Sequence, residues 1–303
     1  MRETVSAGRA GAYVRELFTP RLQAALWMTA AALAFAAMIL LVRILTQRLH
    51  VFEVVFFRNL FGLAVMLPWL WRRGRTALAT RRFPLHLLRA GLGLLAMVLW
   101  FWSLALLPLA EATALSFTAP VIASLLAMPL LGEPFSRHRI LALVAAFAGA
   151  LLILRPGVQV VDPAALLALS TAVVWGASTV LVKMLGRSED SASIVTWMVL
   201  LLSPLSLGLA LPFWRTPEPW ELGLLLLLGA FGSFGHFGLS QALKRADAGF
   251  VAPFDYLRLP FVAWLAWLFL GETVELWTWL GAACIAAAGA YVVRGESAAA
   301  GRR

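Results

Sequence analysis

The chain has 303 residues and a formal net charge of +10. Hydrophobic residues make up 62% of it, charged residues only 13%, and the mean hydropathy is +0.87. A soluble domain of this length needs far more polar surface, so the composition excludes a soluble protein and predicts an all-α integral membrane protein.

The first predicted segment is an arm over residues 1–21, which contains four arginines ahead of the first apolar run. This arrangement is similar to the charged start of a signal peptide. The run that follows, residues 22–45, reaches the roughly 20 residues that span a bilayer, and no convincing small-residue cleavage site precedes the next span. We therefore expect a retained first membrane helix.

Ten apolar runs are long enough to cross the membrane. They fall at 22–45, 51–71, 84–107, 112–131, 138–155, 163–185, 191–213, 219–242, 249–270 and 275–293. With the N-terminus in the cytoplasm, 18 of the 25 Lys and Arg residues lie on the cytoplasmic side and 4 on the other. This bias predicts a multi-pass protein of the inner (cytoplasmic) membrane with both termini cytoplasmic. Orientation and contact with membrane lipid explain the positive charge, so no nucleic-acid binding is expected.

The second half of the chain repeats the first at an offset near 140 residues. LVRILTQRLH (41–50) aligns with LVKMLGRSED (181–190), and LLGEP (130–134) aligns with FLGET (269–273). Because five helices form each copy, the second copy enters the membrane from the opposite face, and the sequence predicts ten transmembrane helices as two inverted five-helix repeats. The predicted parts are a cytoplasmic arm (1–21), the first repeat (22–157), the second repeat (158–294) and a cytoplasmic tail (295–303).

These patterns resemble EamA-type carriers of the drug/metabolite transporter superfamily over roughly residues 22–294. The resemblance rests on Gly132-Glu133 and Gly271-Glu272, on the stretches Ser103-Leu104 through Ala112 and Ala242-Leu243 through Val251, and on Gly149, Gly281 and Gly289. It implies a ten-helix carrier that works by alternating access, with a cavity lined mainly by the first four helices of each repeat. Members of the family include exporters of amino acids and of amino-acid-derived metallophores, and importers of nucleotide-like or vitamin-like cofactors.

Three ionisable residues lie deep in predicted spans, where charge is costly and points to function. Arg58 lies in the second helix, and Asp255 and Arg258 lie in the ninth. The spacing of three places Asp255 and Arg258 on one helical face. The aligned positions in the fourth helix are Ser116 and Ala119, so the fold does not require charge at this level. An ion pair that merely neutralises itself is the alternative interpretation.

Prolines accompany these charges in both repeats. Pro253 and Pro260 bracket the pair, and Pro120 lies at nearly the same level of the fourth helix. Each proline removes a backbone donor, which predicts a helix kink in both repeats. Tyr256 adds a hydroxyl group at the same depth.

Two further helices contain candidate cavity residues. In the eighth helix, His236 is either a packing residue or a polar group of the cavity. Trp175, near the middle of the sixth helix, is better placed to line the cavity than the tryptophans at helix ends, which a membrane aromatic belt explains. Small residues predict close packing of the eighth helix against the third. These residues are Gly229, Gly232, Gly235 and Gly238 in the eighth helix and Ala90, Gly93 and Ala96 in the third.

The sequence contains no Walker-type phosphate loop, no paired carboxylates, no Cys/His metal spacing and no Ser/His/Asp constellation. We therefore expect neither enzyme activity nor a cofactor or metal, and transport driven by gradients. The leading hypothesis is an exporter of a small amino-acid-like or carboxylate-bearing compound, bound by the guanidinium groups of Arg58 and Arg258. If transport is coupled to protons, Asp255 is the candidate carrier, and a close arginine favours its ionised form.

Two other functions stay open at this point. One is import of a flat cofactor-like solute, such as a flavin or an adenosyl compound, stacked on Trp175 and neighbouring aromatic residues. The more remote one is a non-transporting membrane scaffold. A homodimer is compatible with the sequence, and a small-molecule substrate is the expected partner in both transport hypotheses.

Overall fold

The computed structural model describes residues 20–73, 80–132, 137–155, 162–186, 188–189, 191–246, 251 and 254–300. Within these residues every regular element is helical. The helices are α2 (Pro20–Leu45), α3 (Val51–Arg73), α4 (Phe83–Leu106), α5 (Leu109–Ser116), α6 (Ala119–Leu131), α7 (Arg137–Leu154), α8 (Pro163–Leu185), α9 (Ser191–Ala210), the 3-10 helix η2 (Leu211–Phe213), α10 (Pro219–Leu243), α12 (Arg258–Leu270) and α13 (Leu276–Ala300).

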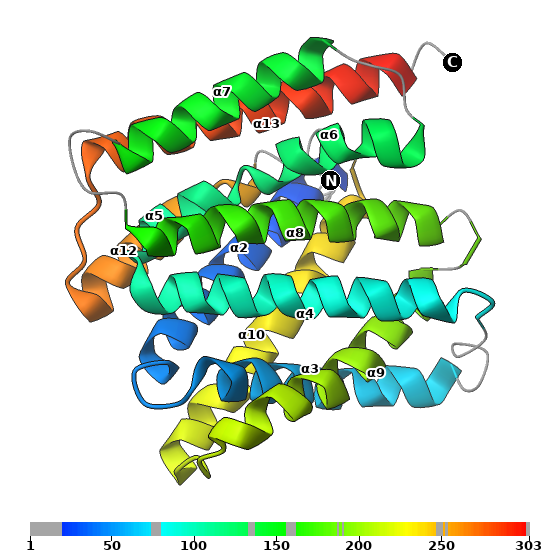
Figure 1. The fold of residues 1–303 in the computed structure, drawn as a ribbon, viewed down its shortest axis with the longest axis vertical. Helices are drawn as coiled ribbons and strands as arrows, with labels where there is room; N and C mark the ends of the chain where they lie inside the picture. Colours follow the sequence, from blue (N-terminus) through cyan, green and yellow to red (C-terminus); the bar gives the residue numbers. More distant parts are fainter. Residues whose placement is uncertain are drawn as a thin grey trace, which may run out of the picture.

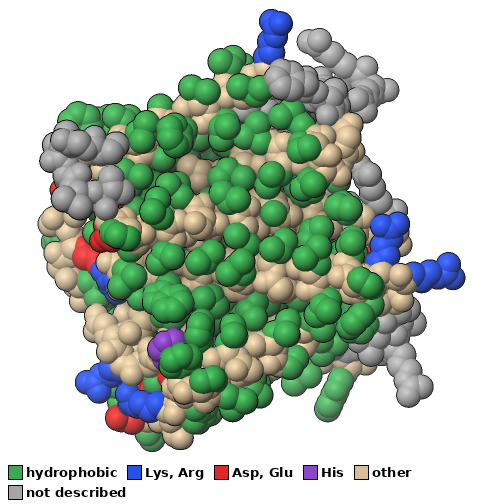
Figure 2. All heavy atoms as spheres, viewed as in Figure 1, with side chains coloured by type: hydrophobic (Ala, Val, Ile, Leu, Met, Phe, Trp, Pro, Cys, Tyr) green, Lys and Arg blue, Asp and Glu red, His purple; other side chains and the backbone are tan. Residues whose placement is uncertain are grey.

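The helices have the length and composition of membrane spans. Among the described residues, six helical stretches are long and apolar enough to cross a bilayer, and three shorter apolar helices accompany them. Figure 2 shows hydrophobic side chains over most of one face, with charged side chains gathered mainly at its left and right margins. The described structure is therefore that of an all-helical, multi-pass membrane protein.

The predicted fourth and ninth helices are each interrupted. The run predicted at 112–131 begins earlier, at Leu109, and a turn at Phe117–Thr118 divides it into α5 and α6. The interruption ends two residues before Pro120, the second residue of α6, whose ring lacks the N–H that would continue the helix. In the second half, a turn at Tyr256–Leu257 precedes α12, and Pro260 is the third residue of that helix. Pro253 lies outside the described residues.

Side-chain hydroxyl groups in and just after α5 form hydrogen bonds that partly replace the backbone bonds lost at this interruption. Thr113 donates to the carbonyl of Leu109, Ser116 to that of Thr113 and Thr118 to that of Leu115, at 2.7–2.8 Å. These bonds satisfy carbonyl groups near the point where the regular backbone ladder ends. Irregular backbone in a membrane is tolerated where it is buried in protein or lines a cavity.

The helices pack as pairs drawn from different parts of the chain. The main pairs are α2 with α10, α4 with α8 and α7 with α13. In Figure 1, α2 and α10 cross behind α4 and α8, while α7 and α13 lie together at one edge. The glycine face of α10 meets α2 and α3: a Cβ atom at Gly235 would lie 2.6 Å from the ring of Phe35. Close packing at these glycines was therefore predicted correctly, but the partner predicted in α4 was wrong, because α2 and α3 cover that face.

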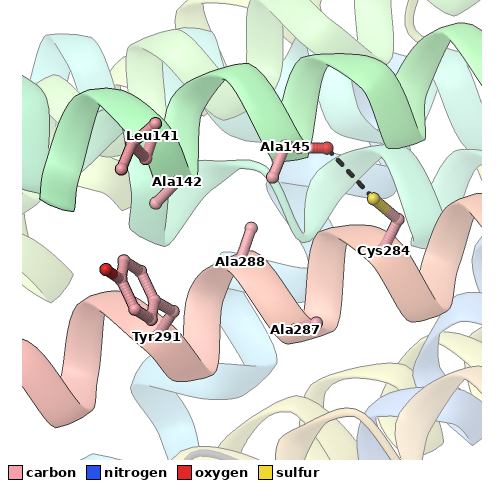
Figure 3. Close-up of a pocket in the computed structure, with 7 residues that line it drawn as sticks. All are labelled: Leu141, Ala142, Ala145, Cys284, Ala287, Ala288 and Tyr291. Atoms are coloured by element: carbon pink, nitrogen blue, oxygen red, sulfur yellow. Dashed lines mark hydrogen bonds between the residues drawn. The ribbon is translucent and has the colours of Figure 1, made fainter.

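The helices α7 and α13 touch through their backbones. A Cβ atom at Gly281 would lie 2.5 Å from the carbonyl oxygen of Gly149, so neither position has room for a side chain. Further along the pair a shallow groove of about 290 Å³ is lined by Leu141, Ala142, Ala145, Cys284, Ala287, Ala288 and Tyr291 (Figure 3). Cys284 donates a hydrogen bond to the carbonyl of Ala145 there.

Glu189 lies in the segment after α8, outside the membrane-spanning stretches. Its carboxylate contacts Thr80, just before α4, and His86, near the beginning of α4. The hydroxyl of Thr80 donates to one carboxylate oxygen of Glu189, and the ring of His86 contacts the other. Burial alone would raise the pKa of Glu189, but hydrogen bonds from Thr80 and His86, the charge of His86 and the backbone N–H of Arg81 outweigh it. The pKa of Glu189 is therefore below its ordinary value.

We expect this contact to make thermal stability depend on pH. Because the pKa of Glu189 is lower in the folded protein, its stabilising effect is complete above the unfolded value of about 4.3 and disappears as the pH falls through the folded value. Above about pH 5 the wild-type protein should melt about 2–4 °C higher than Glu189→Gln in detergent, and the two should converge in more acidic buffer. A difference in melting temperature that is unchanged at about pH 3 would contradict this origin.

Candidate functional site

Seven side chains from both halves of the chain lie where α2, α3, α5, α10 and the start of α12 come together, and we name them the central cluster. They are Phe35 on α2, Arg58 on α3, Phe117 after α5, His236 on α10, and Asp255, Tyr256 and Arg258 around the start of α12. Five of the residues proposed from the sequence thus lie together.

Arg258 is held between aromatic rings. Its guanidinium carbon lies 5.0 Å from the ring centroid of Phe117 and 5.8 Å from that of Phe35, within the range of cation–π attraction. One terminal nitrogen donates to a carboxylate oxygen of Asp255 at 3.2 Å, and the two side chains are 18% and 35% exposed. The Nε atom of Arg258 is buried and has no hydrogen-bond partner among the described residues. The guanidinium group therefore has donor capacity that Asp255 does not use.

Arg58 lies against α10 beside Gly232. A Cβ atom at Gly232 would lie 3.3 Å from two nitrogens of the Arg58 guanidinium and 3.2 Å from the sulfur of Met38. Arg58 donates to the side chain of Asn59 at 3.3 Å, and Asn59 donates in turn to Ser206 of α9. Within the described part of the chain, no carboxylate lies within ion-pair distance of Arg58. A partly buried cation without a counter-ion is costly, so this group is suited to an electron-rich ligand.

His236 lies against Phe35 of α2. Its ring meets the ring of Phe35 edge-on, with 5.2 Å between the centroids. His236 and Arg258 therefore share Phe35 as a neighbour, and the His236 ring offers a further polar group to a ligand.

Tyr256 meets its own counterpart in the first repeat. Superposing Gly271-Glu272 on Gly132-Glu133 aligns Tyr256 with Phe117, and the two rings touch edge to face at 4.9 Å. The hydroxyl oxygen of Tyr256 points at α13, where a Cβ atom at Gly289 would lie 2.0 Å away. Both copies of the sequence thus contribute an aromatic ring to the same point of the fold.

Comparison with known proteins shows which family this arrangement belongs to. The model of the EamA-like transporter family matches residues 22–155 and again residues 162–294. The chain belongs to the EamA-like transporter family. It is therefore a membrane protein that transports small molecules.

Several named relatives align with most of the chain. A riboflavin transporter of Rhizobium johnstonii is 36% identical over 90% of this chain and 91% of its own length. An S-adenosylmethionine uptake transporter of Rickettsia prowazekii is 32% identical, with 83% and 86% covered. The pseudopaline exporter CntI of Pseudomonas aeruginosa is 28% identical, with 85% and 91% covered. A solved crystal structure with 18% identity covers 90% of this chain and 94% of its own, with a TM-score of 0.54, and supports the fold.

Trp175 does not join the central cluster of this EamA-like chain. Its side chain is 45% exposed, and it lies on α8, which packs mainly against α4 and α6. Pro120 and Pro260 lie close to the cluster in the chain, at the beginnings of α6 and α12. They shape the two turns but contribute no polar group to it.

Phe35 and Phe117 are members of the cluster that the sequence did not single out. They offer ring faces, Arg58 and Arg258 offer donors, and Asp255 is the carboxylate acceptor. Among the described residues there is no group of three or more His, Cys, Asp and Glu that could hold a metal ion. The arrangement is suited to a solute that combines an aromatic surface with hydrogen-bond acceptors.

Proposed function

We propose that this EamA-like carrier takes up a flat, cofactor-type solute, with riboflavin as the model compound, by alternating access through the central cluster. The carrying observation is the position of Arg258 between Phe35 and Phe117, with Arg58 left without a carboxylate. A planar heterocycle can stack on the rings while its carbonyl oxygens and ring nitrogens accept from the guanidinium groups. Relatives named as riboflavin and S-adenosylmethionine uptake transporters support this solute class.

The charges of the central cluster favour a flavin over an adenosyl cation. Among its described residues the cluster holds two guanidinium groups and one carboxylate, that of Asp255, which contacts only Arg258, so the cluster carries an excess of positive charge. S-adenosylmethionine carries a sulfonium and an ammonium group against one carboxylate, and like charge in a partly desolvated site is unfavourable. Riboflavin has no such cationic groups, and its dione presents acceptors.

We propose the ten-helix, inverted-repeat architecture for the same chain. Its repeats span 22–157 and 158–294, and both termini lie on the cytoplasmic side of the inner membrane. Two matches to the family model and the aligned turns at Phe117–Thr118 and Tyr256–Leu257 support this arrangement. Under the inverted plan, the central cluster lies between the repeats near the middle of the bilayer.

Export of a carboxylate-bearing, amino-acid-derived compound is the second candidate. The same two arginines suit carboxylates, and one relative is named as the pseudopaline exporter CntI. Asp255 would then hold Arg258 until the substrate carboxylate replaces it. If that exchange is coupled to protons, Asp255→Asn should abolish the proton dependence of flux in proteoliposomes, and an unchanged dependence would remove Asp255 from this role.

Flux and binding separate the two candidates. Purified protein in proteoliposomes should accumulate riboflavin, and riboflavin should compete with its labelled form while amino acids and S-adenosylmethionine should not. Saturable flux of amino acids or of a metallophore, without flux of riboflavin, would favour the second candidate and overturn the first. Sealed liposomes without protein give the leak rate.

Replacing Arg58 should weaken riboflavin binding about tenfold. Arg58→Met keeps the length of the side chain but removes the charged donors, and a hydrogen bond to a charged group contributes about 1.5–3 kcal/mol. Titration of riboflavin fluorescence in detergent measures the change. The matched control is Arg89→Met, because Arg89 also lies on a membrane helix but bonds to the carbonyl of Ile194 and the sulfur of Met198. Equal affinities for the two variants would contradict a role of Arg58 in binding.

A further inference from the structure

A single ion pair joins four segments at one end of the molecule. One nitrogen of Arg43, on α2, donates to the carbonyl oxygens of Leu104 and Ala105 at the end of α4, at 3.0 and 2.6 Å. Its other nitrogen donates to Glu272, just after α12, at 2.9 Å. The second carboxylate oxygen of Glu272 accepts from the backbone N–H of Leu109, the first residue of α5, at 2.8 Å.

Arg43 and Glu272 each contact a helix end whose dipole has the opposite charge. Arg43 binds carbonyl groups at the negative end of the α4 dipole, and Glu272 binds the N–H at the positive end of α5. Both side chains are largely enclosed, at 17% and 19% exposure, where charge-assisted hydrogen bonds are stronger than in open water. The contact is therefore a firm tie between the first half of the chain, which holds Arg43 and Leu109, and the second half, which holds Glu272.

The contact between Arg43 and Glu272 and the central cluster lie at different levels of the same helices, α5 and α12. From Leu109 to Phe117 the chain advances eight residues, about 12 Å of helix, and from Arg258 to Glu272 it advances fourteen residues, about 20 Å. The carboxylate of Asp255 is nevertheless 35% exposed. The protein therefore does not fully enclose the central cluster while the tie is closed.

The inverted copy has the same residue types at the aligned positions. Lys183 aligns with Arg43, and Glu133 aligns with Glu272. Glu133 and the side chain of Lys183 lie outside the described part of the structure. A basic and an acidic residue repeated in both copies is the pattern expected of a contact that serves the two faces of the membrane in turn.

We infer that Arg43 and Glu272 form a gate at the non-cytoplasmic end of the carrier, which must part before the central cluster opens to that face. Separation frees α5 from α12, the two helices that bring Phe117 and Arg258 to the cluster. The inference concerns the transport cycle and holds for either solute of the proposed function.

Access of a thiol reagent to the cluster tests the gate without any substrate. All variants are made in a Cys284→Ala background. Ser116→Cys, beside Phe117, reports access to the central cluster. Thr273→Cys, in a separate variant, shows from which side of the membrane the residues next to Glu272 are labelled. Intact cells and inside-out vesicles receive a membrane-impermeant maleimide. Adding Arg43→Gln or Glu272→Gln should raise, at least fivefold, the labelling rate of Ser116→Cys from the side on which Thr273→Cys is labelled. Unchanged rates in variants that remain monodisperse in size-exclusion chromatography would overturn the gate.

Cross-linking tests whether separation is needed for flux. In the same Cys284→Ala background, Arg43→Cys with Glu272→Cys is joined by a short bifunctional methanethiosulfonate reagent and released by reductant. The joined protein should lose more than 90% of its flux, and reduction should restore it, while each single cysteine variant should be unaffected by the reagent. Normal flux in fully joined protein would overturn the gate. The labelling experiment uses no substrate. A lack of riboflavin flux would therefore contradict the proposed solute, and unchanged labelling would contradict the gate.

Discussion

Glutamine in place of Arg258 is expected to reduce transport by one to two orders of magnitude. The side chain is the point where the aromatic faces of Phe35 and Phe117 meet the charge of Asp255. Glutamine removes the cation–π contacts and leaves Asp255 without its counter-ion, and hydrogen bonds to charged groups contribute about 1.5–3 kcal/mol, which is roughly 10- to 100-fold. Initial flux in proteoliposomes, measured over a range of riboflavin concentrations, gives the loss and assigns it to KM or to the maximal rate.

A surface arginine provides the matched control for that substitution. The guanidinium of Arg48 also lies over an aromatic ring, that of Trp220, at 5.2 Å, but it lies at the end of the molecule rather than in the central cluster. Arg48→Gln should leave flux within about twofold, because exposed contacts of this kind contribute about 0.5–1 kcal/mol to stability and none to a distant site. Arg258→Lys should be intermediate, since an ammonium group keeps the charge but loses the planar donors. Wild-type flux in Arg258→Gln would contradict the assignment of the site.

Alanine at Gly281 should destabilise the protein by about 1–3 kcal/mol, the usual cost of inserting a group into a packed interface. The added methyl group would lie 2.5 Å from the carbonyl oxygen of Gly149 and 2.5 Å from a side-chain carbon of Ile153, so α7 and α13 must move apart. Thermal unfolding in detergent should show a loss of several degrees. The reciprocal variant Gly149→Ala should behave alike, because its methyl group would lie 2.7 Å from the carbonyl oxygen of Gly281.

An open glycine distinguishes this clash from a general effect of alanine. No heavy atom lies within 4 Å of a Cβ atom placed at Gly223, which is also in a membrane helix, α10. Alanine there should be neutral or stabilise by up to about 1 kcal/mol, the difference in helix propensity. Equal melting temperatures for Gly281→Ala and Gly223→Ala would show that the helices α7 and α13 adapt without cost.

The apolar runs predicted where most of the helices lie, because hydropathy and run length are visible in the sequence, but turns divide the predicted fourth and ninth helices. Pro120 indicated a kink, but the full turn at Phe117–Thr118 depends also on hydroxyl groups that replace backbone bonds, which the run of apolar letters does not reveal. The spacing of three residues between Asp255 and Arg258 correctly predicted that their side chains lie within reach of each other, because residues three apart on a helix are neighbours. Local rules therefore account for the elements and for pairs within them.

Contacts between distant elements were beyond the sequence. The depth of Trp175 could be estimated from its helix, but α8 is apolar on every side, so its sequence does not say which face turns inward. Nothing in the sequence distinguishes Phe35 and Phe117 from the other aromatic residues, because their contacts with the Arg258 guanidinium group depend on how distant helices pack. The Gly-Glu motif was evident in the sequence, whereas the partner of Glu272 lies 229 residues away.

The contact between Phe117 and Tyr256 bears on why one chain holds both repeats. Under the proposed inverted-repeat plan, residues that align with each other and also touch lie near the axis that relates the two copies. In a dimer of identical five-helix chains, whatever side chain occupied such a position would face itself, so an aspartate beside the axis would meet a second aspartate. Fusion of the copies lets the two positions diverge, as Ser116 and Asp255 have done. A solute with unlike ends can then be bound in one orientation, which a strictly symmetric pocket does not define.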